Sequence, residues 1–93
     1  MPAFKIAHVR EQGQDMIIVP LDNQFDYKPN STQQEIVSEL QMRARAAGLA
    51  GTVVPVWEAG GHTKFIAPQP WHPFFRGVSM DWVAINLNKQ LSW

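Results

Sequence analysis

The residues of this chain best suited to chemistry are its three histidines, His8, His62 and His72. Transition-metal sites usually draw on histidine and cysteine ligands at short, regular spacing. No histidine lies four residues from another, and the chain contains no cysteine. We therefore expect no bound metal and no cofactor, and no residue is predicted to be catalytic.

His72 is the histidine with the most suggestive neighbours. A general base needs a group that orients it, and Asp81 follows nine residues later, across an expected chain reversal. A histidine placed between Trp71 and Pro73 more often packs its ring against aromatic neighbours. A small enzyme or ligand-binding protein, with a pocket near His72, Arg76 and Asp81, is therefore an alternative interpretation rather than the first one.

The segment Pro68–Gly77, here called the aromatic segment, is the clearest indication of a functional surface. Its three prolines lack a backbone N–H, so it cannot join a regular hydrogen-bonded ladder. It nevertheless carries large aromatic side chains that are costly to leave in water. The segment must lie against its own sheet or against another molecule. The predicted binding surface consists of Trp71, His72, Phe74, Phe75 and Arg76.

The charge of the chain argues against a nucleic-acid partner. Eight basic and eight acidic residues cancel, and the basic residues are scattered along the sequence. Nucleic-acid binders normally have a basic excess, because counterion release supplies much of their affinity. Aromatic side chains beside Arg76 resemble a single-strand clamp, so a nucleic-acid accessory role is kept as a third interpretation. The zero net charge mildly favours self-association.

Neither composition nor patterning indicates a membrane span or a second domain. The apolar run at residues 16–21 is only about six residues long, far shorter than a membrane-crossing helix. The absence of cysteine fits a reducing compartment. We expect one domain over residues 1–93, located in the cytoplasm, with no membrane partner.

One long helix is predicted, over residues 32–47. Thr32 and Glu35 have the spacing of a capping box, and Gly48 suits the position just past a helix end. The apolar residues form one stripe of about 100°, as in a helix that lies on a sheet. These residues are Ile36, Val37, Leu40, Ala44 and Ala47.

Five strands are predicted from alternating or continuous apolar runs. They lie at residues 3–9, 16–19, 52–57, 63–67 and 81–87. The first two are expected to form one hairpin, and the next two a second. Pro55 cannot donate to a ladder, so its strand should be an edge or carry a bulge there.

The predicted fold is α+β, with a single amphipathic helix packed on a bent, mostly antiparallel sheet of four to five strands in the order β-β-α-β-β-β. Residues 16–19 and 53–57 are apolar at consecutive positions, so both faces of the sheet need burial. One helix covers only one face. The other could be covered by the aromatic segment folding back, by closure into a partial barrel, or by a second copy of the chain.

The expected function follows from the aromatic segment. Trp, Phe and Arg are the residue types enriched in the cores of protein interfaces. The sequence therefore favours a non-enzymatic interaction module that forms a homodimer or binds another protein through this segment.

Overall fold

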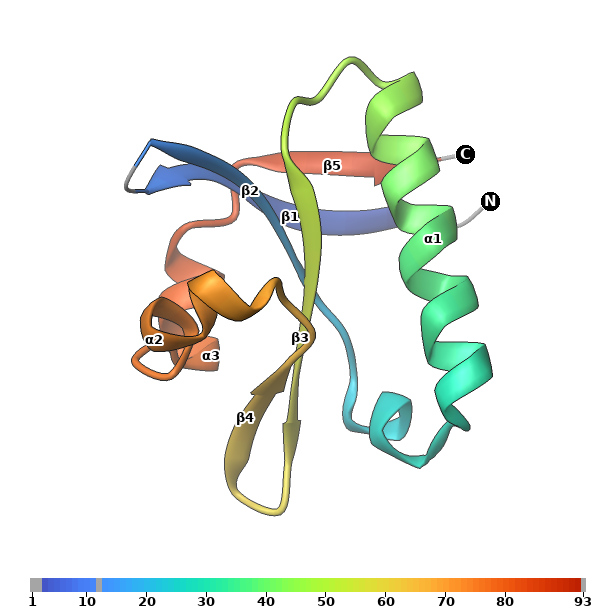
Figure 1. The fold of residues 1–93 in the computed structure, drawn as a ribbon, viewed down its shortest axis with the longest axis vertical. Coiled ribbons are helices and arrows are strands. Elements are labelled where there is room, and N and C mark those ends of the chain that lie inside the picture. The colour runs from blue at the N-terminus through green and yellow to red at the C-terminus, as the bar shows by residue number, and fades with distance from the viewer. Residues whose placement is uncertain (1–2, 12, 93) are drawn as a thin grey trace.

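The computed structural model describes residues 3–11 and 13–92, and its strands form one five-stranded mixed sheet (Figure 1). The strands are β1 (Ala3–Glu11), β2 (Gln14–Pro20), β3 (Thr52–Ala59), β4 (His62–Phe65) and β5 (Lys89–Ser92). Their order is β4-β3-β2-β1-β5, and only the β2–β3 pair is parallel. The predicted α+β class and the chain order of the elements are confirmed.

The long helix α1 (Asn30–Ala46) joins the two parallel strands. Parallel neighbours cannot be linked by a tight turn, and α1 supplies the crossover between β2 and β3. The predicted start at Thr32 is wrong by two residues. The helix begins directly after Pro29, whose fixed φ of −58° suits the entry to a helix, and the Thr32 side chain makes no capping bond. The predicted end is confirmed at Gly48, where φ is +79°.

Two apolar cores lie on opposite faces of the sheet. The helix core, under α1, contains Ile6, Ile17, Val19, Leu40, Ala44, Val53 and Leu91. The cap core, on the other face, contains Ala7, Met16, Ile18, Val54, Val56, Phe75, Val78 and Val83. Neighbouring residues of β2 and of β3 alternate between these cores, because successive side chains in a strand point to opposite faces. The prediction that both faces are buried is therefore confirmed.

The cap core is covered by the aromatic segment together with the residues that follow it. This region folds into a 3-10 turn η2 (Gln69–Trp71) and two short helices, α2 (His72–Phe75) and α3 (Met80–Ile85). Figure 1 shows α2 and α3 on the side of the sheet opposite α1. Of the three proposed covers, the aromatic segment folding back is the one observed, and the sheet is not closed into a barrel.

The predicted strand at residues 81–87 is wrong, because most of that range belongs to α3. The hydroxyl of Ser79 accepts a hydrogen bond from the Trp82 N–H at 3.1 Å and caps the helix. Val83 is buried, and Met80, three residues before it in the same helix, packs against the same core. This spacing is helical. The last strand is instead β5, which pairs with the start of β1.

The second hairpin is confirmed, and it leaves half of β3 without a neighbour on one side. Gly60 and Gly61, at φ of +58° and +80°, form the two-residue turn between β3 and β4. β4 pairs only with β3 from Val56 onward. The Pro55 carbonyl also accepts from the Ile66 N–H at 3.2 Å, so residues 52–54 are the edge on that side, next to Pro55 as predicted. No helix in the described residues is long and apolar enough to cross a membrane.

Candidate interaction surface

Phe75 anchors the cap, and its position corrects one predicted contact residue. Its side chain is only 1% exposed and lies in the cap core. Its ring contacts those of Phe65 and Phe74, at centroid distances of 5.4 and 5.1 Å. Phe75 therefore belongs to the interior of the monomer, and a partner cannot reach it without unfolding the cap.

The other predicted residues lie at the surface of the cap. Trp71, His72 and Phe74 are half-buried, and Arg76 is exposed. Trp71 and Phe74 pack against the cap core from outside. These aromatic side chains are thus held in place from below while part of each remains open to solvent.

Two residues of α3 extend this surface and were missed by sequence analysis. The rings of Phe74 and Trp82 lie edge to face at 5.9 Å, and Trp82 is half-buried. Ile85, three residues further along the same helix, is 83% exposed. We define the aromatic surface as Trp71, His72, Phe74, Arg76, Trp82 and Ile85. The helix-capping pattern at Ser79 was the signal that would have placed the last two residues correctly.

The three polar residues of the alternative pocket are not joined to one another. The Nε2 of His72 is hydrogen-bonded to the carbonyl of Ala67 at 2.9 Å, and its ring packs edge to face on Phe65 at 5.2 Å. Arg76 and Asp81 are both exposed, and among the described residues no hydrogen bond or ion pair links either of them to His72. His72 therefore holds the cap to the chain before it, as its aromatic neighbours indicated.

Neither of the other two histidines belongs to the aromatic surface. The Nε2 of His8 is hydrogen-bonded to the carbonyl of Ala50 at 2.8 Å, and His62 is exposed beside the hairpin turn. Within residues 3–11 and 13–92, no three side chains of the histidine, aspartate or glutamate type gather as metal ligands.

An ion pair fixes the opposite face of β4. Lys64 Nζ lies 2.9 Å from Asp26 Oδ1, and the indole N–H of Trp57 donates to the same oxygen at 3.2 Å. Asp26 belongs to the 3-10 helix η1 (Asn23–Tyr27). The hydrogen bond from Lys64, followed by that from Trp57, lowers the pKa of the Asp26 carboxyl. Lys64 is thus ion-paired with Asp26 of η1.

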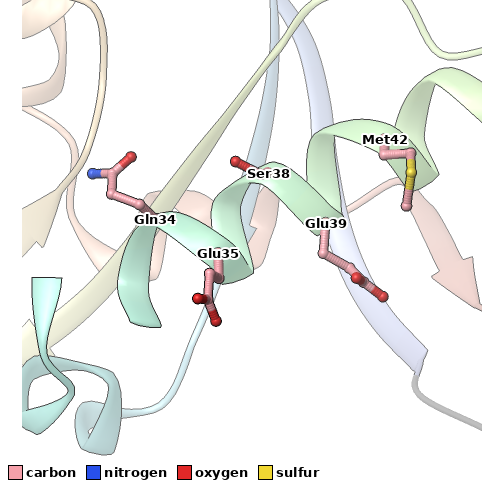
Figure 2. Close-up of a pocket in the computed structure, with 5 residues that line it drawn as sticks. All are labelled: Gln34, Glu35, Ser38, Glu39 and Met42. Carbon is pink, nitrogen blue, oxygen red and sulfur yellow. The ribbon is translucent and has the colours of Figure 1, made fainter. Parts of the chain in front are cut away.

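Two hollows lined by described residues lie away from the aromatic surface. One lies on the outer side of α1 and is lined by Gln34, Glu35, Ser38, Glu39 and Met42. Figure 2 shows these side chains projecting away from the helix rather than toward a common point. Glu39 is paired with Arg43 on the same helix at 3.5 Å. This hollow has the features of a solvated helix face.

A second hollow, of about 310 Å³, is mostly apolar. It lies where η1 and the start of α1 meet the beginning of β1, and it is lined by Phe4, Pro20, Leu21, Asp22, Phe25, Lys28 and Ile36. Its volume is at the lower limit of small-molecule sites. Its apolar lining suits a small apolar ligand, and it lies on the side of the sheet that carries α1.

The fold and surface define a small α+β domain with a helical aromatic cap. Comparison with protein-family models, curated proteins and solved structures gives no match. The function is therefore inferred from the surface itself.

Proposed function

We propose that this chain is a non-enzymatic protein-interaction module that binds another protein, or a second copy of itself, through the aromatic surface. The observation that carries the proposal is that Trp71, Phe74 and Trp82 pack from outside against the cap core, which contains the buried Phe75. Phe74 contacts the rings of both Phe75 and Trp82. Binding energy at interfaces comes mainly from aromatic and arginine side chains that are ordered before the partner arrives. The cap supplies such side chains, with Arg76 beside them.

The composition supports two further parts of the proposal. The balanced charge favours a protein over a nucleic acid, because the chain has no basic excess. The absence of cysteine favours a reducing compartment, so we place the function in the cytoplasm.

A double substitution tests the proposal. Trp71→Ala with Phe74→Ala removes the centre of the aromatic surface and leaves Phe75 in place. Met42→Ala is the matched control, because Met42 is also exposed but lies on α1, on the other face of the sheet. Sedimentation velocity over a concentration series measures self-association, and quantitative co-purification measures partner binding. Thermal melts establish that both variants are folded.

We expect the parent and Met42→Ala to associate equally, with themselves or with a partner, and the double variant to lose that association. If the double variant associates as the parent does, the aromatic surface is not the binding site. If the parent itself binds no protein and remains a monomer at all concentrations, the interaction-module proposal is rejected.

The alternative class, a ligand-binding protein, has the apolar hollow beside η1 in its favour. A ligand that binds only the native state raises the melting temperature in proportion to the logarithm of its concentration. A thermal-shift screen of small apolar metabolites tests this alternative. It fails if no compound raises the melting temperature at concentrations up to the millimolar range.

A further inference from the structure

β4 forms hydrogen bonds to β3 with one of its two sides. The Ile66 N–H donates to the carbonyl of Pro55 at 3.2 Å. Main-chain groups of alternate residues in a strand point to the same side, so those of Lys64 and His62 also face β3. The observed register, with a two-residue turn closing the hairpin, agrees with this arrangement.

The main-chain groups of Thr63 and Phe65 point to the outer side of β4. Figure 1 shows no other element running along that side of the strand. These two residues have four such groups, two N–H and two C=O. None of the four has a hydrogen-bonding partner in the part of the chain that the structure describes. β4 is therefore a short open edge, with alternating donors and acceptors at the spacing of an extended polypeptide.

Two other open stretches of the sheet are closed by side-chain amides. Gln41 of α1 accepts from the Val53 N–H at 2.8 Å and donates to the Gly51 carbonyl at 3.1 Å. Asn88 accepts from the His8 N–H and donates to the His8 carbonyl, both at 2.9 Å. Each carboxamide takes the place of a missing peptide group. The edge of β4 has no such closure.

The other edge strand, β5, differs from β4 in charge. Lys89 has no ion-pair partner among the described residues, and an uncompensated lysine on an edge strand discourages pairing. Lys64 of β4 is instead ion-paired with Asp26. An incoming strand therefore meets a paired rather than an uncompensated lysine at the centre of the β4 edge.

The β4 edge also adjoins the aromatic surface. The ring of Phe65 contacts those of His72 and Phe75 at 5.2 and 5.4 Å. Phe65 and Thr63 point to the cap side of the sheet, whereas Lys64 points to the η1 side. A strand added beside β4 would place every second side chain next to Phe65 and His72.

We infer that the outer edge of β4 is a strand-addition site for an extended segment of another protein, which carries an apolar residue beside Phe65 and polar residues at the flanking positions. This inference rests on the proposed function, because it names how a partner reaches the aromatic surface. Main-chain hydrogen bonds hold such a segment, and side-chain contacts on alternate residues give specificity.

A second copy of the chain fits this edge less well. Antiparallel pairing of two β4 strands that uses all four open groups centres the register on Lys64 and places Thr63 of one copy opposite Phe65 of the other. The position beside Phe65 is then taken by a threonine rather than by a larger apolar side chain. A partner segment has no such constraint on its sequence.

The test removes one outward N–H without touching the hairpin. Thr63→Pro lacks the donor that an added strand would use, and proline is tolerated at an edge whose N–H faces solvent. Thr63→Val is the matched control, because it changes the same side chain and keeps the N–H. Melting temperatures within a few degrees of the parent show that both variants retain the fold.

The probe is a phage-displayed library of random linear twelve-residue peptides, selected on the immobilised full chain. Peptides that are enriched are synthesised and titrated against parent and variants. We expect enriched peptides with an apolar residue at every second position. Thr63→Pro should weaken their binding by about tenfold or more, whereas Thr63→Val should leave it unchanged. Hydrogen exchange at the Thr63 and Phe65 amides should slow when the peptide binds.

Each other outcome separates the inference from the proposed function. Binding that survives Thr63→Pro but is lost in the Trp71→Ala, Phe74→Ala variant rejects strand addition and keeps the aromatic surface. Binding lost in Thr63→Pro but kept in that variant supports strand addition and rejects the aromatic surface. Failure to enrich any peptide, or a dimer that Thr63→Pro dissociates, overturns the inference of a partner segment.

Discussion

Replacing Gln41 by methionine should destabilise the fold far more than its half-buried position indicates. Its carboxamide makes two hydrogen bonds to the open stretch of β3, to Val53 and to Gly51. Val53 is only 3% exposed. Methionine has similar length and helix propensity, so Gln41→Met removes the two bonds while changing little else.

The expected cost follows from hydrogen-bond energetics. Each bond contributes about 1 kcal/mol net, and a buried N–H left without a partner costs about 1–3 kcal/mol. We therefore expect a loss of about 2–3 kcal/mol for Gln41→Met. In a domain of this size, 1 kcal/mol corresponds to about 4–8 °C in melting temperature. The expected shift is about 10–20 °C.

The control is the same substitution on the same helix, Gln34→Met. Gln34 is exposed and makes no hydrogen bond within the described residues. Melting curves for the two variants, and hydrogen exchange at the Val53 amide, measure the effect directly. Relative to the parent, the Val53 amide should exchange faster in Gln41→Met and at an unchanged rate in Gln34→Met. If the two variants melt within about 2 °C of each other, Gln41 does not close the edge.

A second substitution at this position, Gln41→Glu, should change the stability in a pH-dependent way. A carboxylate can still accept from Val53, but it cannot donate to the Gly51 carbonyl, whereas a protonated carboxyl can. Its pKa in the folded state should therefore lie above the unfolded value of about 4.3. The stability that the protonated group contributes is fully present below that unfolded value and is lost as the pH rises through the folded pKa. The melting difference from the parent should thus shrink at low pH, and a difference independent of pH contradicts the assigned bonds.

Three further substitutions test the two cores and the ion pair. Leu40→Ala should cost about 2–4 kcal/mol in chemical denaturation, because Leu40 is buried in the helix core; a parent-like midpoint contradicts that placement. Phe75→Ala should cost about 3–5 kcal/mol by the same assay, because Phe75 anchors the cap; a small loss means that the cap does not depend on it. Asp26 has a pKa below its ordinary value of 3.8, so its contribution is present above that pH and is lost as the pH falls through the folded pKa. Melting temperatures from pH 6 to pH 2.5 should therefore decline less steeply for Asp26→Asn than for the parent, and equal slopes refute the pairing with Lys64.

The helix and the two hairpins could be predicted because local signals agree with the tertiary structure there. Gly48 ends α1 and Gly60 opens the second hairpin, each at a positive φ that suits glycine. The consecutive apolar residues of β2 and β3 correctly required two cores. In these elements, the spacing of apolar residues in the sequence matches the pattern of buried side chains in the structure.

The C-terminal third could be predicted only in part. Residues 82–87 alternate in a way that fits a strand, but Ser79 and the position of Val83 in the cap core make a short helix. A window of six residues is too short to distinguish the two periods. Because that helix was missed, Trp82 and Ile85 were missing from the predicted surface.

The side-chain amide hydrogen bonds that close open stretches of the sheet could not be predicted, for a different reason. Gln41 lies outside the predicted apolar stripe of the helix, and nothing in its neighbours indicates a bond to residues 51 and 53. That contact depends on how α1 sits against β3, which is a tertiary property. The exclusion of Phe75 from the surface has the same origin, since two adjacent phenylalanines, Phe74 and Phe75, give no sign of which one turns inward.

Binding of a partner segment at the free edge of β4 depends on the aromatic contact as well as on the main-chain hydrogen bonds. Four main-chain hydrogen bonds at about 1 kcal/mol each give about 4 kcal/mol, which corresponds to a dissociation constant near 1 mM. Loss of rotational and translational freedom weakens even that. The edge alone is therefore too weak to make the chain aggregate. An apolar side chain buried beside Phe65 and His72 adds about 1.5–3 kcal/mol. A segment that lacks this side chain should bind roughly ten- to a hundredfold more weakly, so the aromatic contact, rather than the strand, selects the partner.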